Sequence, residues 1–270
     1  MANKYLGRED APISAAVWEK LDAAMIEAAK AQLVGRRLLY IEGPYGLGLK
    51  AIPLEDAFIT AAADTPEVLT STAIPVPLIR TTFVLGTRDL ANYEREGVTL
   101  DLNKVVEAAI ACARLEDDLI FNGLAKLRLP GLLNVPGHNK VKLSAWEKVG
   151  DAADDLIKAL TALDDSGFHG PYSLALAPSR YNLLFRRYPQ GNQTEMEHLQ
   201  SMVTAGIFKA PILKDGGVLL ASGLQYASIV IGQDMSIGFI GPSDGDLEFS
   251  ISESLVLRVR QPKSICVLEA

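Results

Sequence analysis

A β-rich stretch in the first third of the chain limits what this sequence can fold into more than any other feature. Residues 49–85 carry few large apolar side chains on a consistent face, and four prolines interrupt them: Pro53, Pro66, Pro75 and Pro77. Because proline is confined to edge strands, the pattern predicts a long hairpin rather than part of a central sheet. Two arms of about twelve residues at roughly 3.3 Å per residue would reach about 40 Å, against a radius of gyration of roughly 18 Å for a compact chain of this length. An isolated two-stranded ribbon is marginal in water, so we expect this arm to project and to lie on a neighbouring molecule.

The composition predicts a folded chain that works in a reducing compartment. Hydrophobic residues make up 49% of the 270 residues and charged residues 22%, which is enough apolar material for a core and too much for disorder. The net charge of -7 gives no reason to expect a nucleic-acid partner. The two cysteines, Cys112 and Cys266, are too few for a disulfide framework. Neither a signal segment nor a membrane span is evident, so we expect a cytoplasmic protein with no membrane partner.

Helical periodicity predicts two long helices. The first follows Ser14 and stops near Gly35, and residues 36–42 are then expected to form a short strand. The second, a spine helix, is expected to start at Asp101, to keep one face apolar as far as Leu124 and to end at Leu129-Pro130-Gly131. Its apolar face is predicted to exclude four acids, which are Glu107, Glu116, Asp117 and Asp118.

The rest of the chain alternates helix and strand patterns. The expected elements are a helix over 144–163, a strand over 172–177, helices over 180–185 and 195–205, and strands over 217–221 and 227–231. This alternation predicts a separate α/β unit in the middle of the chain. Residues 247–259 and 265–268 alternate as strands, so the tail is expected to return to a sheet.

The residues do not assemble an evident catalytic centre. Among the three histidines only His198 has acids beside it, Glu195 and Glu197, and at these spacings the three do not share one helix face. A solvated helix surface is therefore predicted there, and no metal site. The adjacent acids at 154–155 and 164–165 point to different helix faces and are expected to be solubilising charges. A structural role is favoured over a catalytic one.

Several short strings, in order along nearly the whole chain, resemble the encapsulin shell proteins of the linocin-type family, family 1. They are Trp18, Gln32-Leu33-Val34-Gly35-Arg36, Glu42-Gly43-Pro44-Tyr45-Gly46, Glu116-Asp117, Ile120-Phe121-Asn122-Gly123, Gly170-Pro171-Tyr172 and Gly232-Gln233-Asp234-Met235-Ser236-Ile237-Gly238. Any one string is weak, whereas together they are specific.

The resemblance implies an α+β fold, that of the major capsid proteins of tailed bacteriophages. Its parts would be an N-terminal helical arm, a peripheral domain with the spine helix, an extended β-hairpin loop and an axial α/β domain. On this chain the arm and the first part of the peripheral domain would occupy 1–43, the extended loop 44–80, the peripheral domain with the spine helix 81–131, the axial domain 132–231, and the returning peripheral strands 232–270.

The function implied is that of a shell subunit and not of an enzyme. Many copies would assemble into an icosahedral nanocompartment in the cytoplasm, which encloses a cargo enzyme that carries a C-terminal targeting peptide. Ferritin-like iron oxidases and dye-decolourising peroxidases are frequent cargoes in the family, which implies iron storage or defence against oxidative stress. Two alternatives stay open: a hydrolase or peptidase whose site is not local in sequence, and a prophage capsid protein.

The resemblance also implies a cargo-peptide site on the inner wall. It would form an apolar groove between the N-terminal helix and the peripheral domain, with an acid to pair with basic residues of the peptide. The matching positions are Met25, Leu33, Arg36, Asp234, Met235, Ile237 and Gly238. The alternative is that Met25 and Ile237 belong only to the core.

A second implied site is the loop that lines the five-fold pore. It comprises Tyr188, Pro189, Gln190, Gly191, Asn192, Gln193 and Thr194. Five copies would form a polar, uncharged constriction that passes small hydrated ions with weak charge selection. Some relatives bind a flavin near a tryptophan whose place Arg88 takes here, so no flavin or other cofactor is expected.

Overall fold

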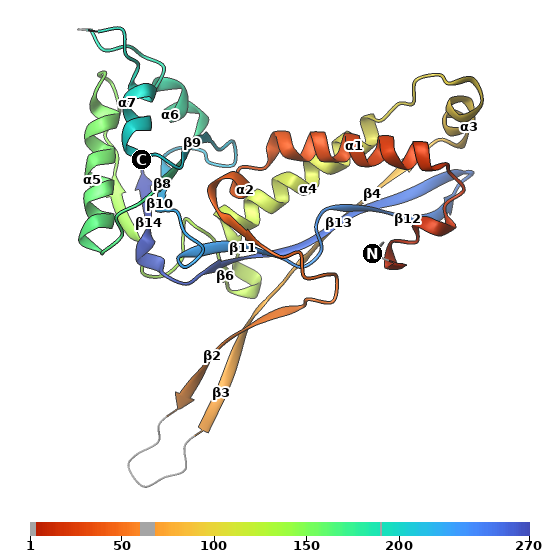
Figure 1. Ribbon diagram of the computed structural model, residues 1–270, viewed down its shortest axis with the longest axis horizontal. Coiled ribbons are helices and arrows are strands. Elements are labelled where there is room, and N and C mark those ends of the chain that lie inside the picture. Colours follow the sequence, from red (N-terminus) through yellow and green to blue (C-terminus); the bar gives the residue numbers. More distant parts are fainter. Residues whose placement is uncertain (1–3, 60–67, 190) are drawn as a thin grey trace. The chain divides into compact units, whose positions relative to one another are not determined.

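The chain consists of two compact units, which are described separately (Figure 1). The computed structural model describes residues 4–59, 68–189 and 191–270. The first unit comprises Met1–Ala28, Gly43–Cys112 and Val230–Val256, and the second comprises Ala29–Glu42, Ala113–Ile229 and Leu257–Ala270. The boundaries fall within four elements, which are α1 (Ala15–Gln32), α4 (Asn103–Phe121), β11 (Ala227–Ile231) and β13 (Asp246–Val259). The five-part division predicted from the sequence stays a prediction.

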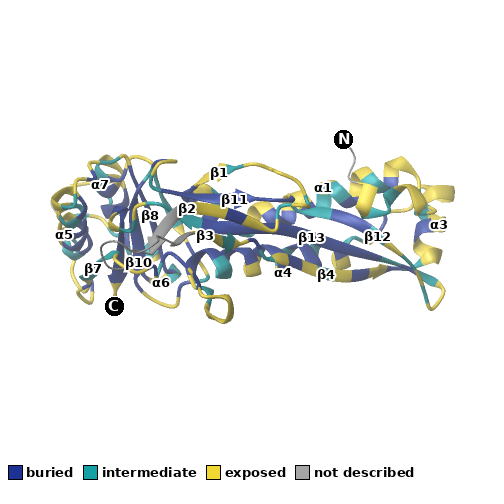
Figure 2. Ribbon diagram, turned by 90° about the horizontal axis from the view of Figure 1, so that it is seen from below, coloured by how far each residue is buried: buried dark blue, intermediate teal, exposed yellow. Residues whose placement is uncertain are grey.

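The first unit is built on β13, which pairs antiparallel with a strand on each side. One partner is β12 (Ser236–Ser243) and the other is β4 (Leu78–Leu85). Figure 2 shows β13 buried along most of its length. Phe249 lies at the centre of an aromatic cluster, with its ring centroid 5.4 Å from that of Phe83 and 5.7 Å from that of Trp18. One face of β13 thus packs against the N-terminal helix α1 through Phe249 and Trp18.

Helices and N-terminal turns complete this unit. Val17, Leu21 and Met25 recur at helical spacing on α1, and all three are buried. Two short turns precede α1, namely η1 (Lys4–Leu6) and η2 (Arg8–Asp10), and both contact β12. Arg8 joins them to the helix, because its guanidinium lies 4.0 Å from the Trp18 ring and pairs with Asp22 at 2.7 Å. The unit also contains α3 (Thr87–Glu96), which the sequence interpretation did not predict.

The predicted long hairpin is present but shorter than expected. β2 (Ala51–Ile59) and β3 (Val68–Pro75) pair antiparallel, with Ala51 opposite Pro75. Among the described strands neither pairs with a third strand. Residues 78–85 were expected in the hairpin, yet they form β4 in the sheet, because Ile79, Phe83 and Leu85 present a buried apolar face to it. Pro66 lies outside the described residues.

The second unit contains the predicted α/β arrangement. Its sheet has the order β7-β14-β10-β8-β9. The strands are β7 (Asn139–Lys142), β8 (Tyr172–Leu176), β9 (Gly206–Lys209), β10 (Gly217–Ala221) and β14 (Ile265–Glu269). α5 (Asp151–Asp165) contacts β7, β14 and β10, and α6 (Pro178–Leu183) contacts β9. The last strand, β14, pairs with β10 and β7 and not with β13. The remaining elements of this unit are α7 (Glu195–Met202), β1 (Tyr40–Glu42), α2 (Gly35–Leu38), η3 (Ala125–Leu127), β5 (Gly123–Leu124), β6 (Leu129–Pro130) and η4 (Pro262–Ser264).

The helix expected over 144–163 begins only at Asp151. Asp155 is responsible, because its Oδ2 accepts hydrogen bonds from Ser144 N (2.7 Å), Ser144 Oγ (2.8 Å) and Trp146 Nε1 (3.0 Å). These bonds hold the preceding segment in a turn that competes with helix. Asp155 is 1% exposed, so it is not the solubilising charge that the sequence interpretation assigned. Burial would raise the pKa of Asp155, but hydrogen bonds from Lys158, Ser144 and Trp146 lower it to about 2.

Two acids of the spine helix also differ from expectation. Glu116 and Asp117 were predicted to lie off the apolar face, yet they are 0% and 4% exposed. Both carboxylates can be buried because other residues of the second unit donate hydrogen bonds to them. Glu116 accepts two bonds of 2.8 Å from the guanidinium of Arg36. Asp117 accepts from the backbone N–H groups of Val34 and Gly35, at 2.9 Å each.

Two helix boundaries differ from the predicted ones because of the local backbone geometry. The spine helix α4 ends at Phe121, before the predicted stop at Leu129-Pro130-Gly131, since Gly123 has φ 73° and a side chain there would clash with the carbonyl oxygen of Leu129. Residues 35–38 form the helical turn α2 instead of the start of a strand. Asp117 bonds the N–H groups at the start of this turn, and the strand β1 follows at Tyr40.

No helix within the described ranges of the chain is long and apolar enough to cross a membrane.

Candidate pore loop and cargo surface

The predicted pore loop is a tight turn between α6 and α7. Tyr188 N donates to the carbonyl of Gln193 at 3.1 Å, and Gly191 N donates to the carbonyl of Tyr188 at 3.2 Å. Arg187 and Thr194 form an isolated antiparallel bridge that closes the base. Pro189, Gly191, Asn192 and Gln193 are exposed, whereas Gln190 lies outside the described residues. The described tip therefore presents polar or small side chains without charge.

Thr194 ends the loop and caps the following helix. Its Oγ1 accepts from Glu197 N at 3.2 Å, while Glu197 Oε2 accepts from Thr194 N at 2.7 Å, which is a capping box. Bonds from the backbone and side chain of Thr194 hold the pKa of Glu197 below its usual value. The spacing Thr194-x-x-Glu197 is the signature of such a box, so this cap could have been predicted from the sequence.

A buried ion pair supports the base of the loop. Glu195 is 0% exposed, and its Oε2 accepts from Arg186 Nη2 at 3.0 Å. Its Oε1 accepts from Gly150 N at 2.7 Å, and Arg186 Nη1 donates to the carbonyl of Trp146 at 2.8 Å. The predicted solvated helix surface is therefore wrong for Glu195, although Glu197 is exposed as predicted. The loop is instead tied to the start of α5 by a charged, hydrogen-bonded junction.

Tyr188 links the loop to α7. Its hydroxyl lies 2.8 Å from His198 Nδ1, and the two rings contact edge to face with centroids 5.6 Å apart. Burial raises the pKa of Tyr188, and the nearby carboxylates of Glu195 and Asp154 act in the same direction. The hydroxyl therefore stays protonated and can donate to the imidazole of His198.

The predicted cargo-site residues divide between the two units. Met25, Asp234, Met235, Ile237 and Gly238 belong to the first unit, and Leu33 and Arg36 to the second. Met25, Leu33 and Ile237 are 3%, 6% and 0% exposed.

Asp234 and Met235 offer the accessible part of this set in the first unit. Asp234 is exposed and Met235 half-buried. Asp234 Oδ1 accepts from Met235 N at 2.9 Å, which shapes the turn before β12. Gly238 is covered, because a side chain there would lie 2.9 Å from the carbonyl oxygen of Leu6. Asp234 and part of Met235 thus lie at the surface, whereas Met25, Leu33 and Ile237 are buried.

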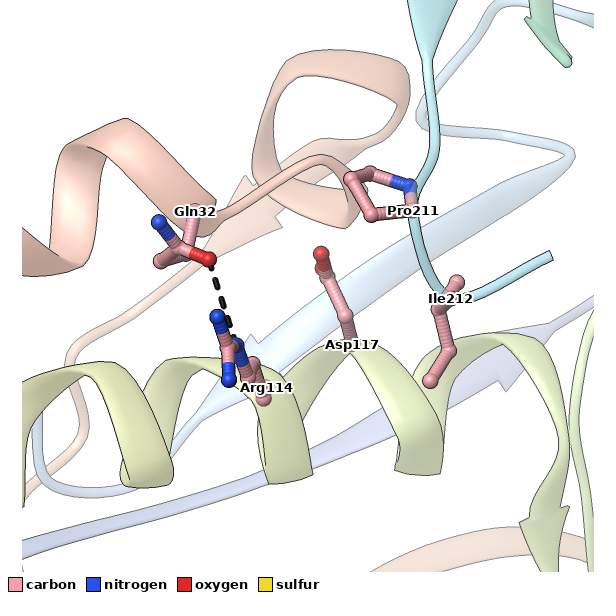
Figure 3. A pocket seen from close by; sticks show the side chains of 5 residues that line it. All are labelled: Gln32, Arg114, Asp117, Pro211 and Ile212. Atoms are coloured by element: carbon pink, nitrogen blue, oxygen red, sulfur yellow. Dashed lines mark hydrogen bonds between the residues drawn. The ribbon is translucent and has the colours of Figure 1, made fainter. Parts of the chain in front are cut away.

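A pocket that the sequence did not indicate lies beside the buried Asp117. Its volume is about 400 Å³, and Figure 3 shows the lining side chains. They are Gln32, Arg114, Asp117, Pro211 and Ile212. Arg114 Nε donates to Gln32 Oε1 at 3.3 Å across one side. Burial raises the pKa of Asp117 from 3.8 to about 6, against the effect of the backbone donors Gly35 and Val34.

Replacing Asp117 with asparagine is expected to change how stability depends on pH. The folded carboxyl keeps its proton up to about pH 6, whereas the unfolded one loses it near 3.8. The folded state therefore binds more protons between these values, and its unfolding free energy falls as pH rises through this window, by up to about 3 kcal/mol. Asparagine does not titrate, so the fall should be absent in Asp117→Asn.

The measurement is the urea unfolding midpoint between pH 4 and 7, and the quantity compared is its slope against pH. The control is Asp118→Asn at the neighbouring position, whose carboxylate bonds Asn122 on the helix surface at 2.7 Å. This control should keep the slope of the unmodified protein. Equal slopes for Asp117→Asn and the unmodified protein would show that Asp117 does not titrate in this range.

Comparison with known proteins gives one consistent group. A family model described as an encapsulating protein for peroxidase matches residues 3–256. The chain is 32% identical over 262 residues to a diheme-cytochrome-encapsulin shell fusion protein of Kuenenia stuttgartiensis, covering 93% of this chain and 72% of the relative. It is 30% identical over 276 residues to the type 1 encapsulin shell protein EncA of Myxococcus xanthus, covering 98% and 96%.

Solved structures agree with the sequence matches. The virus-like particle from Pyrococcus furiosus matches with a TM-score of 0.73 at 25% identity, covering 94% of this chain and 99% of that one. The capsid of Myoviridae phage XM1 matches with a TM-score of 0.63 at 14% identity, covering 85% and 88%. At this identity the phage capsid informs on the fold alone.

Proposed function

The chain belongs to the family of type 1 encapsulin shell proteins, and we propose that many copies of it close into an icosahedral compartment around a cargo protein. The observation that carries this proposal is the match to a shell relative along 98% of the chain. The fold prediction, an α+β fold of the tailed-phage capsid type, is confirmed by the structural neighbours. In accord with the family resemblance, the proposal places the compartment in the cytoplasm.

The hairpin of β2 and β3 gives a physical reason for assembly. Each of its strands has an outer edge that no described strand of the same chain covers. Such edges are satisfied by pairing or by cover from another chain. We expect a neighbouring copy to provide this cover, so that folding of the hairpin is linked to assembly.

The cargo proposed is a redox or iron protein. One relative carries a diheme cytochrome fused to its shell, and the matching family is described as encapsulating a peroxidase. Iron storage or defence against oxidative stress by a ferritin-like protein or a peroxidase would fit this class. In this proposal the shell itself does not catalyse, and a C-terminal peptide of the cargo docks at Asp234 and the neighbouring Met235, the accessible members of the predicted set.

The pore loop would control what reaches the cargo. Five loops of residues 188–194 around one axis would form a channel with an uncharged polar rim, as the described tip residues are exposed and carry no charge. Backbone and amide dipoles discriminate weakly between cations and anions compared with rings of charge. Small hydrated ions of either sign, iron included, are therefore the proposed traffic.

Replacing Asp234 with lysine should reduce cargo loading by about tenfold while leaving the shell intact. The exposed carboxylate would pair with basic residues of the targeting peptide, and lysine would repel them. The probe is a fluorescent protein fused to the C-terminal tail of the candidate cargo, a ferritin-like protein or a peroxidase. The measurement is the ratio of fluorescence to shell protein in purified particles.

Asp234→Asn separates charge from local shape. Asparagine keeps the acceptor for Met235 N and removes the charge, so it should give a partial loss of loading. Undiminished loading of Asp234→Lys would refute the cargo site. A probe that never co-purifies with particles of the unmodified protein would instead refute encapsulation of that cargo.

A further inference from the structure

Ser250 and Ser252 of β13 face away from the N-terminal helix. Phe249 faces α1, since its ring contacts that of Trp18 with centroids 5.7 Å apart. Because side chains alternate along a strand, Ser250 and Ser252 point to the opposite face of the sheet. On β4, Arg80 is the register partner of Ser252 and therefore lies on this same face, beside it. The short serine side chains leave a hollow next to this arginine.

The hollow is a pocket of about 250 Å³ in the first unit. Its polar part is formed by Arg80, Gln233, Ser250 and Ser252, and its apolar part includes side chains of η1, β4 and β12. None of the described lining residues is acidic. Sites for drug-sized ligands have volumes of about 300–1,000 Å³, so this smaller pocket suits a small ion or a short molecule.

The donors of this pocket are not used up inside the chain. Ser250 is 8% exposed, and its hydroxyl makes no hydrogen bond to a described residue. Arg80 forms no ion pair within the part of the chain that the structure describes. Ser252 Oγ accepts from Gln233 Nε2 at 3.0 Å, so its own O–H proton stays available for another acceptor. A positive charge and two hydroxyl donors thus meet in a pocket without an acid to neutralise them.

We propose that this pocket binds a phosphate group. The planar guanidinium of Arg80 can donate two parallel N–H bonds to two phosphate oxygens. The hydroxyls of Ser250 and Ser252 would donate to the others from the neighbouring strand. A carboxylate has only two oxygens, so the tetrahedral group uses donors from two strands more fully. The pocket shares no residue with the predicted cargo site or the pore loop, and the inference therefore goes beyond the proposed shell function.

Equilibrium dialysis of the purified intact protein against radiolabelled inorganic phosphate tests the site. The solution contains about 0.15 M chloride, which screens exposed charges more than about 8 Å apart. We expect saturable binding of about one phosphate per chain, with half-saturation near about 1 mM. Arg80→Met keeps an apolar stem and removes the charge, so it should weaken binding at least about tenfold. Ser250→Ala removes a hydroxyl that makes no bond inside the described chain and should weaken binding about fivefold.

Arg88→Met is the matched control. Arg88 is exposed on α3 and does not line the pocket, so this variant should bind phosphate like the unmodified protein. The proposal would be overturned if the unmodified protein showed no saturable binding. Equal affinities of Arg80→Met and Arg88→Met would also overturn it, because binding would then not depend on the guanidinium in the pocket.

Competition with phenyl phosphate identifies the source of the phosphate group. Displacement of the label at a lower concentration than unlabelled inorganic phosphate requires would assign the site to a phosphate monoester, whose organic part lies on the apolar side of the pocket. Displacement at a higher concentration would assign the site to the free ion. Both results support a phosphate site, whereas no displacement by either compound would contradict it.

Discussion

Arg186→Ala is expected to lower the free energy of unfolding of the second unit by about 3–5 kcal/mol, the cost of leaving a buried charge without its partner. Glu195 is 0% exposed and depends on the guanidinium for two of its hydrogen bonds, at 3.0 and 3.2 Å. The alanine variant also removes the donor to the carbonyl of Trp146. The corresponding drop in the thermal unfolding midpoint is roughly 6–20 °C, measurable by calorimetry.

Arg187→Ala is the matched control. Arg187 is the next residue and is exposed, so its removal should change stability by no more than about 0.5 kcal/mol. Arg186→Lys should recover only part of the loss, because an ammonium cannot reproduce the two-point bond to the carboxylate. If Arg186→Ala and Arg187→Ala melted at the same temperature, the junction would not support the loop as the geometry indicates.

Shortening the hairpin is expected to abolish shell assembly. Pro53 and Ala73 are register partners, so replacing residues 54–72 by Asn-Gly closes the ribbon with a two-residue turn directly beyond this pair. The shortened ribbon keeps its local pairing but loses the strand edges that we expect a neighbouring copy to cover. Size-exclusion chromatography with light scattering should find small species or aggregates in place of particles.

An intermediate variant tests whether the length of the ribbon matters. Phe58 and Leu69 are also register partners, so replacing residues 59–68 by Asn-Gly keeps more of both strands. This variant should assemble less than the unmodified protein and more than the shorter one. Intact shells from the shortest ribbon would show that the hairpin is not what holds neighbours together.

Much of the fold could be predicted from the sequence because local apolar patterns decided it. The strands β8, β10, β11 and β14 lie within about one residue of their predicted bounds, since each is a continuous apolar run between turn signals. The helix α1 was predicted from the apolar residues that recur along it at helical spacing. The long hairpin was indicated by prolines and the lack of a consistent apolar face, although its second arm was extended into β4.

The buried acids could not be predicted, because their partners are distant in the chain. Glu116 is bonded by Arg36, 80 residues away, and Glu195 by Gly150, 45 residues away. Periodicity identifies a carboxylate as polar and therefore assigns it to solvent, whereas burial depends on donors that only the tertiary structure brings near. Asp155 was also assigned to solvent because it is polar, although its donors Ser144 and Trp146 lie only 11 and 9 residues before it.

The candidate pore loop was proposed from the resemblance, whereas the contacts that support this loop could not be predicted. Nothing in the string from Tyr188 to Thr194 indicates that Tyr188 bonds His198 or that Arg186 bonds Glu195. The capping box at Thr194 is the part of this support that the spacing does reveal. The composition of the tip could thus be predicted, and the contacts that hold it could not.

The mass of the purified protein in solution tests the central claim most directly. Light scattering combined with electron microscopy should show hollow particles of about 1.7 MDa or more, since the smallest icosahedral shell contains about 60 copies of a 29.1 kDa chain. A stable, folded species of one or two chains at micromolar concentration, with no particles present, would contradict the account.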